Sequence, residues 1–167
     1  MSKLKKEREF YTVRGYQILH AEERLLTSSM EDYLEMIYRI CMKKEYVRIN
    51  QLSEKLNVRP SSATKVVQKL KELGLVHYQP YGVIQLTEEG ISIGAFLLRR
   101  HKIIEKFLKN LGIENTLLKD TEMIEHDVSL ATLENMHIMN EFLYHNSDVK
   151  ERYEFFKGKF QMDKNSC

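Results

Sequence analysis

Chain-breaking residues are scarce in this sequence, and their scarcity is the strongest constraint on its fold. Only two prolines, Pro60 and Pro80, and seven glycines interrupt the 167 residues. Proline disrupts helices and central strands, and glycine commonly ends helices, so segments that lack both residues can continue as long helices. Apolar residues recur at helical spacing through most of these segments. We therefore expect a mostly α-helical protein with little sheet.

The composition excludes several classes of protein. The chain is 30% charged, and no apolar run approaches the roughly 20 residues that a membrane span needs. The first residues, MSKLKKEREF, lack the apolar block of a signal peptide, so we expect a cytoplasmic protein with no membrane partner. With only two cysteines, Cys41 and Cys167, neither a disulfide framework nor a cysteine zinc site is predicted. Any metal ligands should then be oxygen and nitrogen atoms.

The first strong helical pattern is SSMEDYLEMIYRICM, residues 28–42. Ser28 followed by Glu31 forms a capping-box pattern at its start. Apolar residues then recur on one side of the predicted helix, as a stripe made of Met30, Tyr33, Leu34, Ile37, Tyr38 and Cys41. Asp32 and Glu35 fall on nearly the opposite side, so the periodicity alone places both carboxylates in solvent.

Residues 49–76, INQLSEKLNVRPSSATKVVQKLKELGLV, have the pattern of a helix-turn-helix. Asn50 is a good N-cap for a short first helix, Pro60 suits the first turn of a second, and Gly74 suits the residue just after its end. The outward face of the second helix is polar and can reach phosphates and base edges, although such a face is also common on ordinary surfaces. The candidate DNA contacts here are Arg59, Ser61, Ser62, Thr64, Lys65 and Gln68.

A hairpin is predicted directly after this motif, in LVHYQPYGVIQLTEEG, residues 75–90. Two β-prone runs, 75–78 and 83–86, surround a Pro-Tyr-Gly turn that would place Tyr81 at the tip as a further DNA contact. Thr87 then begins a long helix that ends near Asn110. A helix-turn-helix followed by a hairpin is the order of a winged helix.

The segment TEMIEHDVS, residues 121–129, carries Glu122, Glu125 and His126 at positions i, i+3 and i+4. On a helix this spacing brings the three side chains within an arc of roughly 100°, so they can converge on one ion, although surface helices often carry acids at the same spacing. His101 lies on the apolar side of the long helix, where a histidine is usually packed at an interface. The apolar spacing from Leu130 to His145 is typical of a core or a subunit interface.

Four separated segments now match one family in order. SSMEDYLEMIY, RPSSATKVVQKL, LLRRHKIIEKFL and EMIEHDVS together resemble the diphtheria-toxin-repressor family of metal-activated transcription regulators, most closely its manganese-transport-regulator branch. The resemblance covers about residues 28–145. It implies a winged-helix DNA-binding domain at 28–90 and an all-helical metal-binding and dimerisation domain at 91–167. Residues 1–27 form an N-terminal extension, which departs from the family because it is longer than in the relatives.

The resemblance also implies a metal site where the two domains meet. Carried over residue by residue, its ligands are Asp32, Glu35, His101, Glu122, Glu125 and His126. Carboxylates and imidazoles without a thiolate suit Mn²⁺ or Fe²⁺, and the manganese branch binds two ions in each subunit. One departure adjoins the site, because Asp127 stands where close relatives carry a second histidine.

The resulting prediction is a manganese-activated repressor of metal uptake genes, with Fe²⁺ as the alternative ion. Its partners would be double-stranded operator DNA and a second copy of the chain, and it would be neither an enzyme nor a binder of small organic substrates. Two other interpretations stay open. One is a ferritin-like carboxylate enzyme, although the Glu-x-x-His pattern of those proteins is missing. The other is a winged-helix regulator that binds no metal.

Overall fold

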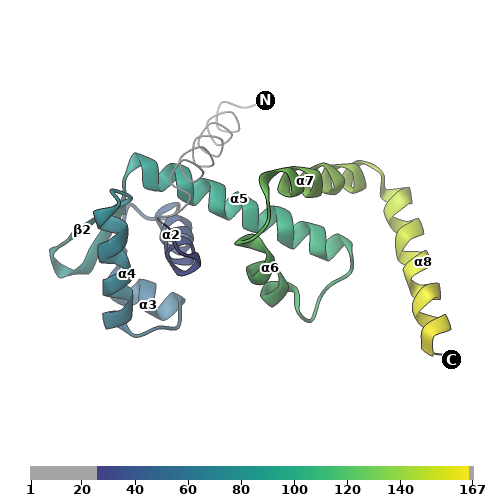
Figure 1. Ribbon diagram of the computed structural model, residues 1–167, viewed down its shortest axis with the longest axis horizontal. Coiled ribbons are helices and arrows are strands. Elements are labelled where there is room, and N and C mark those ends of the chain that lie inside the picture. Colours follow the sequence, from purple (N-terminus) through teal and green to yellow (C-terminus); the bar gives the residue numbers. More distant parts are fainter. Residues whose placement is uncertain (1–25, 166–167) are drawn as a thin grey trace. The chain divides into compact units, whose positions relative to one another are not determined.

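The computed structural model describes residues 26–165, apart from the side chains of residues 161 and 163–165 (Figure 1). The predicted extension at 1–27 therefore lies almost wholly outside the described residues. The described chain is mostly helical with one small antiparallel sheet, which confirms the predicted fold class. It divides into two compact units, here called unit 1, which ends at Arg99, and unit 2, which begins at Arg100. The division falls inside helix α5 (Glu88–Asn110), whereas the proposed domain boundary lies near the start of this helix.

Unit 1 has the element order of a winged helix. Its elements before α5 are α2 (Ser28–Cys41), β1 (Val47–Arg48), α3 (Ile49–Lys55), α4 (Pro60–Glu72), β2 (Val76–Gln79), the short 3-10 turn η1 (Pro80–Gly82) and β3 (Val83–Leu86). The strands form one sheet in the order β1-β3-β2, with both pairs antiparallel. The predicted hairpin is thus present in the form of β2 and β3. The two-residue strand β1 was not predicted, because two residues are too short for a pattern.

The ends of the helices show which local sequence signals predict a helix boundary correctly. As predicted, Pro60 begins α4, Gly74 follows its end with a φ of 73°, and the Thr87 hydroxyl accepts a hydrogen bond from the Gly90 amide at 3.1 Å. Two predicted caps are wrong. The N-cap of α2 is Thr27 rather than Ser28, and Thr27 accepts a hydrogen bond from the Met30 amide at 3.3 Å.

The other wrong cap is Asn50, which lies inside the first turn of α3. The helix begins one residue earlier, at Ile49, because β1 ends at Arg48 and leads directly into it. The Asn50 backbone carbonyl accepts a hydrogen bond from the Ser53 hydroxyl at 2.9 Å, within the same turn.

The core of unit 1 lies between α2, α4, the sheet and the first half of α5. Its fully buried side chains include Leu34, Ile37, Leu52, Val67, Leu70, Leu75, Ile84, Ile93 and Leu97. A glycine lets α5 approach α2 closely, because a Cβ atom at Gly94 would lie 2.6 Å from the Cβ atom of Tyr38. This dense packing holds α4 and the wing on a rigid support.

Unit 2 contains the end of α5, followed by α6 (Leu117–Glu125), α7 (Leu130–His145) and α8 (Ser147–Asn165). A buried amide joins α7 to α5. The Asn140 side chain donates a hydrogen bond to the Ile103 carbonyl at 2.9 Å and accepts one from the Asn110 side chain at 2.9 Å. Because a buried amide without partners is costly, these bonds favour one register of α7 on α5. No helix within the described residues is both long and apolar enough to cross a bilayer.

Candidate functional site

The exposed face of α4 carries the polar side chains that the sequence placed there. Arg59, Ser61, Ser62, Lys65 and Gln68 are all exposed. The opposite face of the same helix is anchored by buried apolar residues, namely Ala63, Val67 and Leu70. Helix α4 therefore presents hydroxyls, an amide and cations on an element that its own core holds in place.

Thr64 differs from its neighbours on α4. It is only partly exposed, and its hydroxyl donates a hydrogen bond to the Pro60 carbonyl at 2.9 Å. This donor is already used within the helix, so Thr64 has its methyl group and its oxygen lone pairs left for contacts with another molecule.

The tip of the wing carries an unusual tyrosine. Tyr81 is 94% exposed and has a φ of 63°, in the left-handed region that residues other than glycine seldom adopt. The next residue, Gly82, is held close to Ile49, because a Cβ atom at Gly82 would lie 2.7 Å from Ile49 Cγ2. The turn thus projects an aromatic ring into solvent at a conformational cost on the order of 1–3 kcal/mol, which is a mark of functional turns.

Two predicted metal ligands lie on α2 in unit 1. Asp32 is exposed, as the periodicity indicated, whereas Glu35 is buried, which the periodicity did not indicate. The Glu35 carboxylate accepts a hydrogen bond from Arg39 Nε at 2.8 Å and forms an ion pair with the same guanidinium. Arg39 is not among the residues predicted from the sequence, although its i+4 spacing from Glu35 is typical of such an ion pair.

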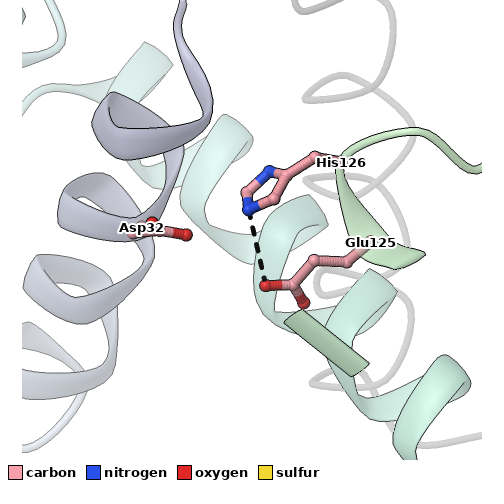
Figure 2. Close-up of side chains that lie close together, drawn as sticks. All are labelled: Asp32, Glu125 and His126. Carbon is pink, nitrogen blue, oxygen red and sulfur yellow. Dashed lines mark ion pairs between the residues drawn. The ribbon is translucent and has the colours of Figure 1, made fainter. Parts of the chain in front are cut away.

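Three other predicted ligands come together within unit 2. His101 on α5 lies with its Nδ1 atom 2.9 Å from Glu125 Oε2, and His126 Nε2 lies 3.9 Å from Glu125 Oε1. Figure 2 shows Glu125 and His126 at the end of α6, joined by this ion pair, and draws Asp32 of unit 1 as well. The Glu125 side chain is only 4% exposed. Each oxygen of one buried carboxylate therefore faces a different imidazole.

The local backbone explains this arrangement. Glu125 is the last residue of α6, and His126 is its C-cap, so the chain turns away directly after the two side chains. Ser129 then caps α7 by accepting a hydrogen bond from the Thr132 amide at 3.2 Å. Glu122 lies one turn earlier on α6 with an exposed side chain, and it is not part of the closest cluster among the described residues.

The arrangement in unit 2 has the chemistry of a metal-ligand set. A carboxylate that holds an imidazole by hydrogen bonding is a common feature of metal sites, where it fixes the orientation of the ring. Oxygen and nitrogen donors without sulfur suit Mn²⁺, Fe²⁺ or other divalent ions of similar preference. The site therefore supports binding of a divalent cation rather than nucleophilic or redox chemistry of a cysteine.

Comparisons with known proteins place both units in one family. Residues 25–84 match the iron dependent repressor N-terminal DNA binding domain, and residues 87–154 match the iron dependent repressor metal binding and dimerisation domain. The regulator MntR of Lysinibacillus sphaericus is 36% identical over 137 residues, which cover 81% of this chain and 99% of that protein. MntR of Bacillus subtilis is 40% identical over 113 residues, or 67% of this chain and 80% of that protein.

Solved structures agree with this assignment. The manganese regulator SloR is 30% identical with a TM-score of 0.60, over 71% of this chain and 55% of that chain. A manganese-dependent transcriptional repressor complex with manganese has the same identity and TM-score, over 68% of this chain and 53% of that chain. The match thus takes in about half of these longer chains. The resemblance seen in the sequence is confirmed: the chain belongs to the iron-dependent repressor family of metal-responsive transcription regulators.

Proposed function

We propose that this protein is a manganese-activated repressor that binds operator DNA as a homodimer. The observation that carries the metal part is the buried Glu125 carboxylate, whose two oxygens face His101 and His126 within unit 2. The manganese regulators among the relatives support the choice of ion. The absence of cysteine from the proposed ligand set also supports Mn²⁺, with Fe²⁺ as the second choice.

The proposed ligand set draws on both units. It consists of Asp32 and Glu35 from unit 1, and His101, Glu122, Glu125 and His126 from unit 2. A bound divalent cation supplies the positive charge that allows four carboxylates to converge, and carboxylates can bridge, so two ions in each subunit are proposed. Because the donors belong to two units, their convergence restricts how the units can be arranged. The restricted arrangement is the one that we propose binds DNA.

The proposed DNA surface is the exposed face of α4 together with the wing tip. Lys65 and Arg59 would neutralise phosphates, while Ser61, Ser62, Thr64 and Gln68 would reach base edges in the major groove. Tyr81 would contact the DNA from the wing. In a two-fold dimer, two copies of α4 would read half-sites about 34–36 Å apart, one turn of DNA.

The proposed dimer uses the side of α7 that faces away from α5. Ile138 and Phe142 are exposed one turn apart, on the side opposite the buried Asn140. Such a face on a helix is costly to leave in water and is typical of a subunit interface. Repression, rather than activation, follows from the family's name, and metal uptake genes as the targets are part of the proposal.

The test is metal-dependent DNA binding. A duplex selected from a random pool with the purified protein and Mn²⁺ would be titrated by fluorescence anisotropy with Mn²⁺, Zn²⁺, anaerobic Fe²⁺ or chelator present. We expect Mn²⁺ to tighten binding by about fivefold to 150-fold, the usual range of allosteric coupling, and chelator to reverse the effect. Equal affinity with Mn²⁺ and chelator would instead support the regulator that needs no metal.

A pair of variants makes the test specific to the site. Glu122→Gln, in the proposed ligand set, should reduce the response to Mn²⁺, whereas Glu88→Gln should leave it unchanged. Both glutamates are exposed helical residues, and Glu88 lies in the first turn of α5, away from the proposed ligands in the sequence. An equal loss in both variants would indicate a general effect of charge, and the ligand role of Glu122 would then be wrong.

A further inference from the structure

Helix α8 is left almost uncovered by the rest of unit 2. Among the α8 residues whose exposure is described, only Val149, Lys150, Lys157 and Gly158 are even partly covered. Helices in proteins obtain most of their stability from packing of an apolar face, and an isolated helix of this length is marginal in water. Yet the exposed residues of α8 include Tyr153, Phe155, Phe156, Phe160 and Met162. This composition indicates that another surface covers part of the helix.

The exposed apolar residues of α8 fall on two different sides. Tyr153, Phe156 and Phe160 have the spacing i, i+3 and i+7, which places them on one face, here called the aromatic stripe. The Phe156 and Phe160 rings stack with their centroids 6.2 Å apart and their planes 20° apart. They remain 65% and 53% exposed. The stripe is therefore an ordered aromatic surface that faces solvent.

Phe155 lies on a different side and in a different environment. The Lys159 ammonium lies 4.5 Å from the centroid of its ring, in the geometry of a cation–π contact. Covering Phe155 would also require removing this charge from water, which is unfavourable. The contrast selects the aromatic stripe as the face that binds another surface and leaves Phe155 as a matched control.

Lys157 fixes which side of α8 faces the end of α5. Lys157 Nζ donates hydrogen bonds to the Leu111 carbonyl at 2.6 Å and the Gly112 carbonyl at 3.3 Å, at the end of α5. Gly112 has a φ of 74°, and a Cβ atom there would clash with the Lys157 ammonium. The contact neutralises the carbonyl end of α5 and holds one side of α8 toward it. The aromatic stripe lies beside this anchored side.

The area needed for a stable dimer points to a second copy of the chain as the covering surface. A specific interface buries about 800 Å² on each partner. The exposed apolar side chains of α7, such as Ile138 and Phe142, can supply only part of that area. The stripe adds to that area, because a fully buried aromatic side chain contributes about 150–250 Å². Tyr153, Phe156 and Phe160 still expose 37%, 65% and 53% of their surface. The dimerisation-domain match also runs to residue 154, past the end of α7 and into α8.

We propose that the aromatic stripe of α8 packs against a second copy of this chain and forms one continuous dimer interface with the exposed face of α7. The inference rests on the proposed homodimer and specifies which second element completes it. Lys157 acts as the anchor that presents the stripe, and Tyr153, Phe156 and Phe160 supply the contact.

Sedimentation velocity over a range of protein concentrations, with Mn²⁺ present, tests the inference. The double variant Phe156→Asp/Phe160→Asp should weaken dimerisation by about 30-fold or more, the effect of losing a central aromatic contact. The control Phe155→Asp adds one negative charge to the same helix, against two in the stripe variant, and should change dimerisation by less than about threefold. Circular dichroism checks that helix content is kept, and Phe156→Ala/Phe160→Ala replaces the first variant if it is not.

The outcomes separate this inference from the dimer itself. If the stripe variant dimerises like the wild type while Phe142→Asp is monomeric, α7 alone forms the interface and the role of α8 is wrong. If Phe155→Asp weakens the dimer as much as the stripe variant, the assignment of faces on α8 is wrong. A wild-type protein that is monomeric at micromolar concentration would overturn the proposed homodimer as well.

Discussion

The two units of this protein treat their apolar side chains differently. Among the described residues of unit 1 most are buried, and the exposed large apolar ones are Met42, Tyr46, Val58 and Tyr81. Unit 2 leaves many more in solvent, spread over α6, α7 and α8: Leu118, Met123, Ile138, Met139, Phe142, Tyr144, Tyr153, Phe155, Phe156, Phe160 and Met162. Unit 1 therefore covers most of its apolar side chains by its own packing, whereas unit 2 has apolar surface that a binding partner can cover.

The polar residues differ in the same way. In unit 1, the exposed face of α4 can contact a polyanion, because Lys65 and Gln68 are exposed on a helix whose other face is buried. In unit 2, the polar group of the proposed site is buried, because the Glu125 carboxylate lies between two imidazoles. The proposed DNA-reading face therefore lies on unit 1, whereas unit 2 contributes the buried carboxylate and both imidazoles to the proposed metal site.

The largest effect should come from one leucine in the core of unit 1. Leu70 is fully buried, so Leu70→Ala should lower the free energy of unfolding by about 2–5 kcal/mol. In unit 2, Phe142→Ala at an exposed position should change the unfolding of the monomer by less than about 0.5 kcal/mol, while weakening the dimer. Denaturant unfolding followed by circular dichroism at several protein concentrations separates the two effects. A large loss for Phe142→Ala at the lowest concentration would remove the contrast between the units.

DNA affinity should respond to cations of unit 1 and not to those of unit 2. Lys65→Ala should weaken binding to all duplexes and reduce the salt slope by about one, whereas Gln68→Ala should cost about 1–3 kcal/mol and relax the sequence preference. Lys119, an exposed lysine on α6, is the matched control. Anisotropy titrations at several salt concentrations measure all three variants. If Lys119→Ala matches Lys65→Ala, the reading surface is not confined to unit 1.

Much of this fold follows from local sequence signals, because the physics of those signals is local. Gly74 ends α4 since only glycine adopts its φ of 73° without strain, and Thr87 caps α5 with its own hydroxyl. The wrong caps have equally local reasons. Thr27 and Ser28 offer the same hydroxyl one residue apart, and the pattern cannot choose between them.

The site was less accessible to sequence reasoning. Helix periodicity takes account of one helix only. It therefore predicts that Glu35 lies in solvent, whereas the structure buries this residue. The left-handed turn at Tyr81 was not foreseen either, because nothing in Pro-Tyr-Gly requires the tyrosine rather than a glycine to take a positive φ. The approach of His101 to Glu125 joins residues far apart in sequence, and only the family resemblance connected them. The complete ligand set remains a prediction.

A smaller effect should distinguish the two halves of the proposed ligand set. Glu35 of unit 1 is held by the Arg39 guanidinium, whereas Glu125 of unit 2 faces imidazoles. Because a cation that binds Glu35 competes with Arg39, Arg39→Met should tighten Mn²⁺ binding by about two- to fivefold, which is the worth of a partly exposed ion pair. Lys43→Met, one turn further on, should have no effect. Weaker Mn²⁺ binding in Arg39→Met, measured by calorimetry, would show that Arg39 positions Glu35 instead.

The smallest predicted effect is electrostatic and lies on the surface of unit 2. The hydrogen bond from Lys106, and then its charge, hold the pKa of Glu141 below its usual value, and His137 and His145 contribute in the same direction. The small stabilisation from this pair is therefore present above the usual pKa of glutamate and is lost as the pH falls through the lowered pKa. Lys106→Met should return the pKa toward its usual value in a carboxyl NMR titration. An unchanged pKa would show that Lys106 does not govern the α5–α7 surface.

The central claim is that one metal site draws its ligands from both units, and Asp32 tests it most directly. Asp32 is exposed on α2 in unit 1, so Asp32→Asn should leave the fold intact. Calorimetric titration with Mn²⁺ should show at least about a tenfold loss of affinity, or the loss of one bound ion, together with a weaker response of DNA binding to Mn²⁺. Unchanged stoichiometry and affinity would show that unit 2 binds the metal alone, which would contradict the claim that the ion couples the two units.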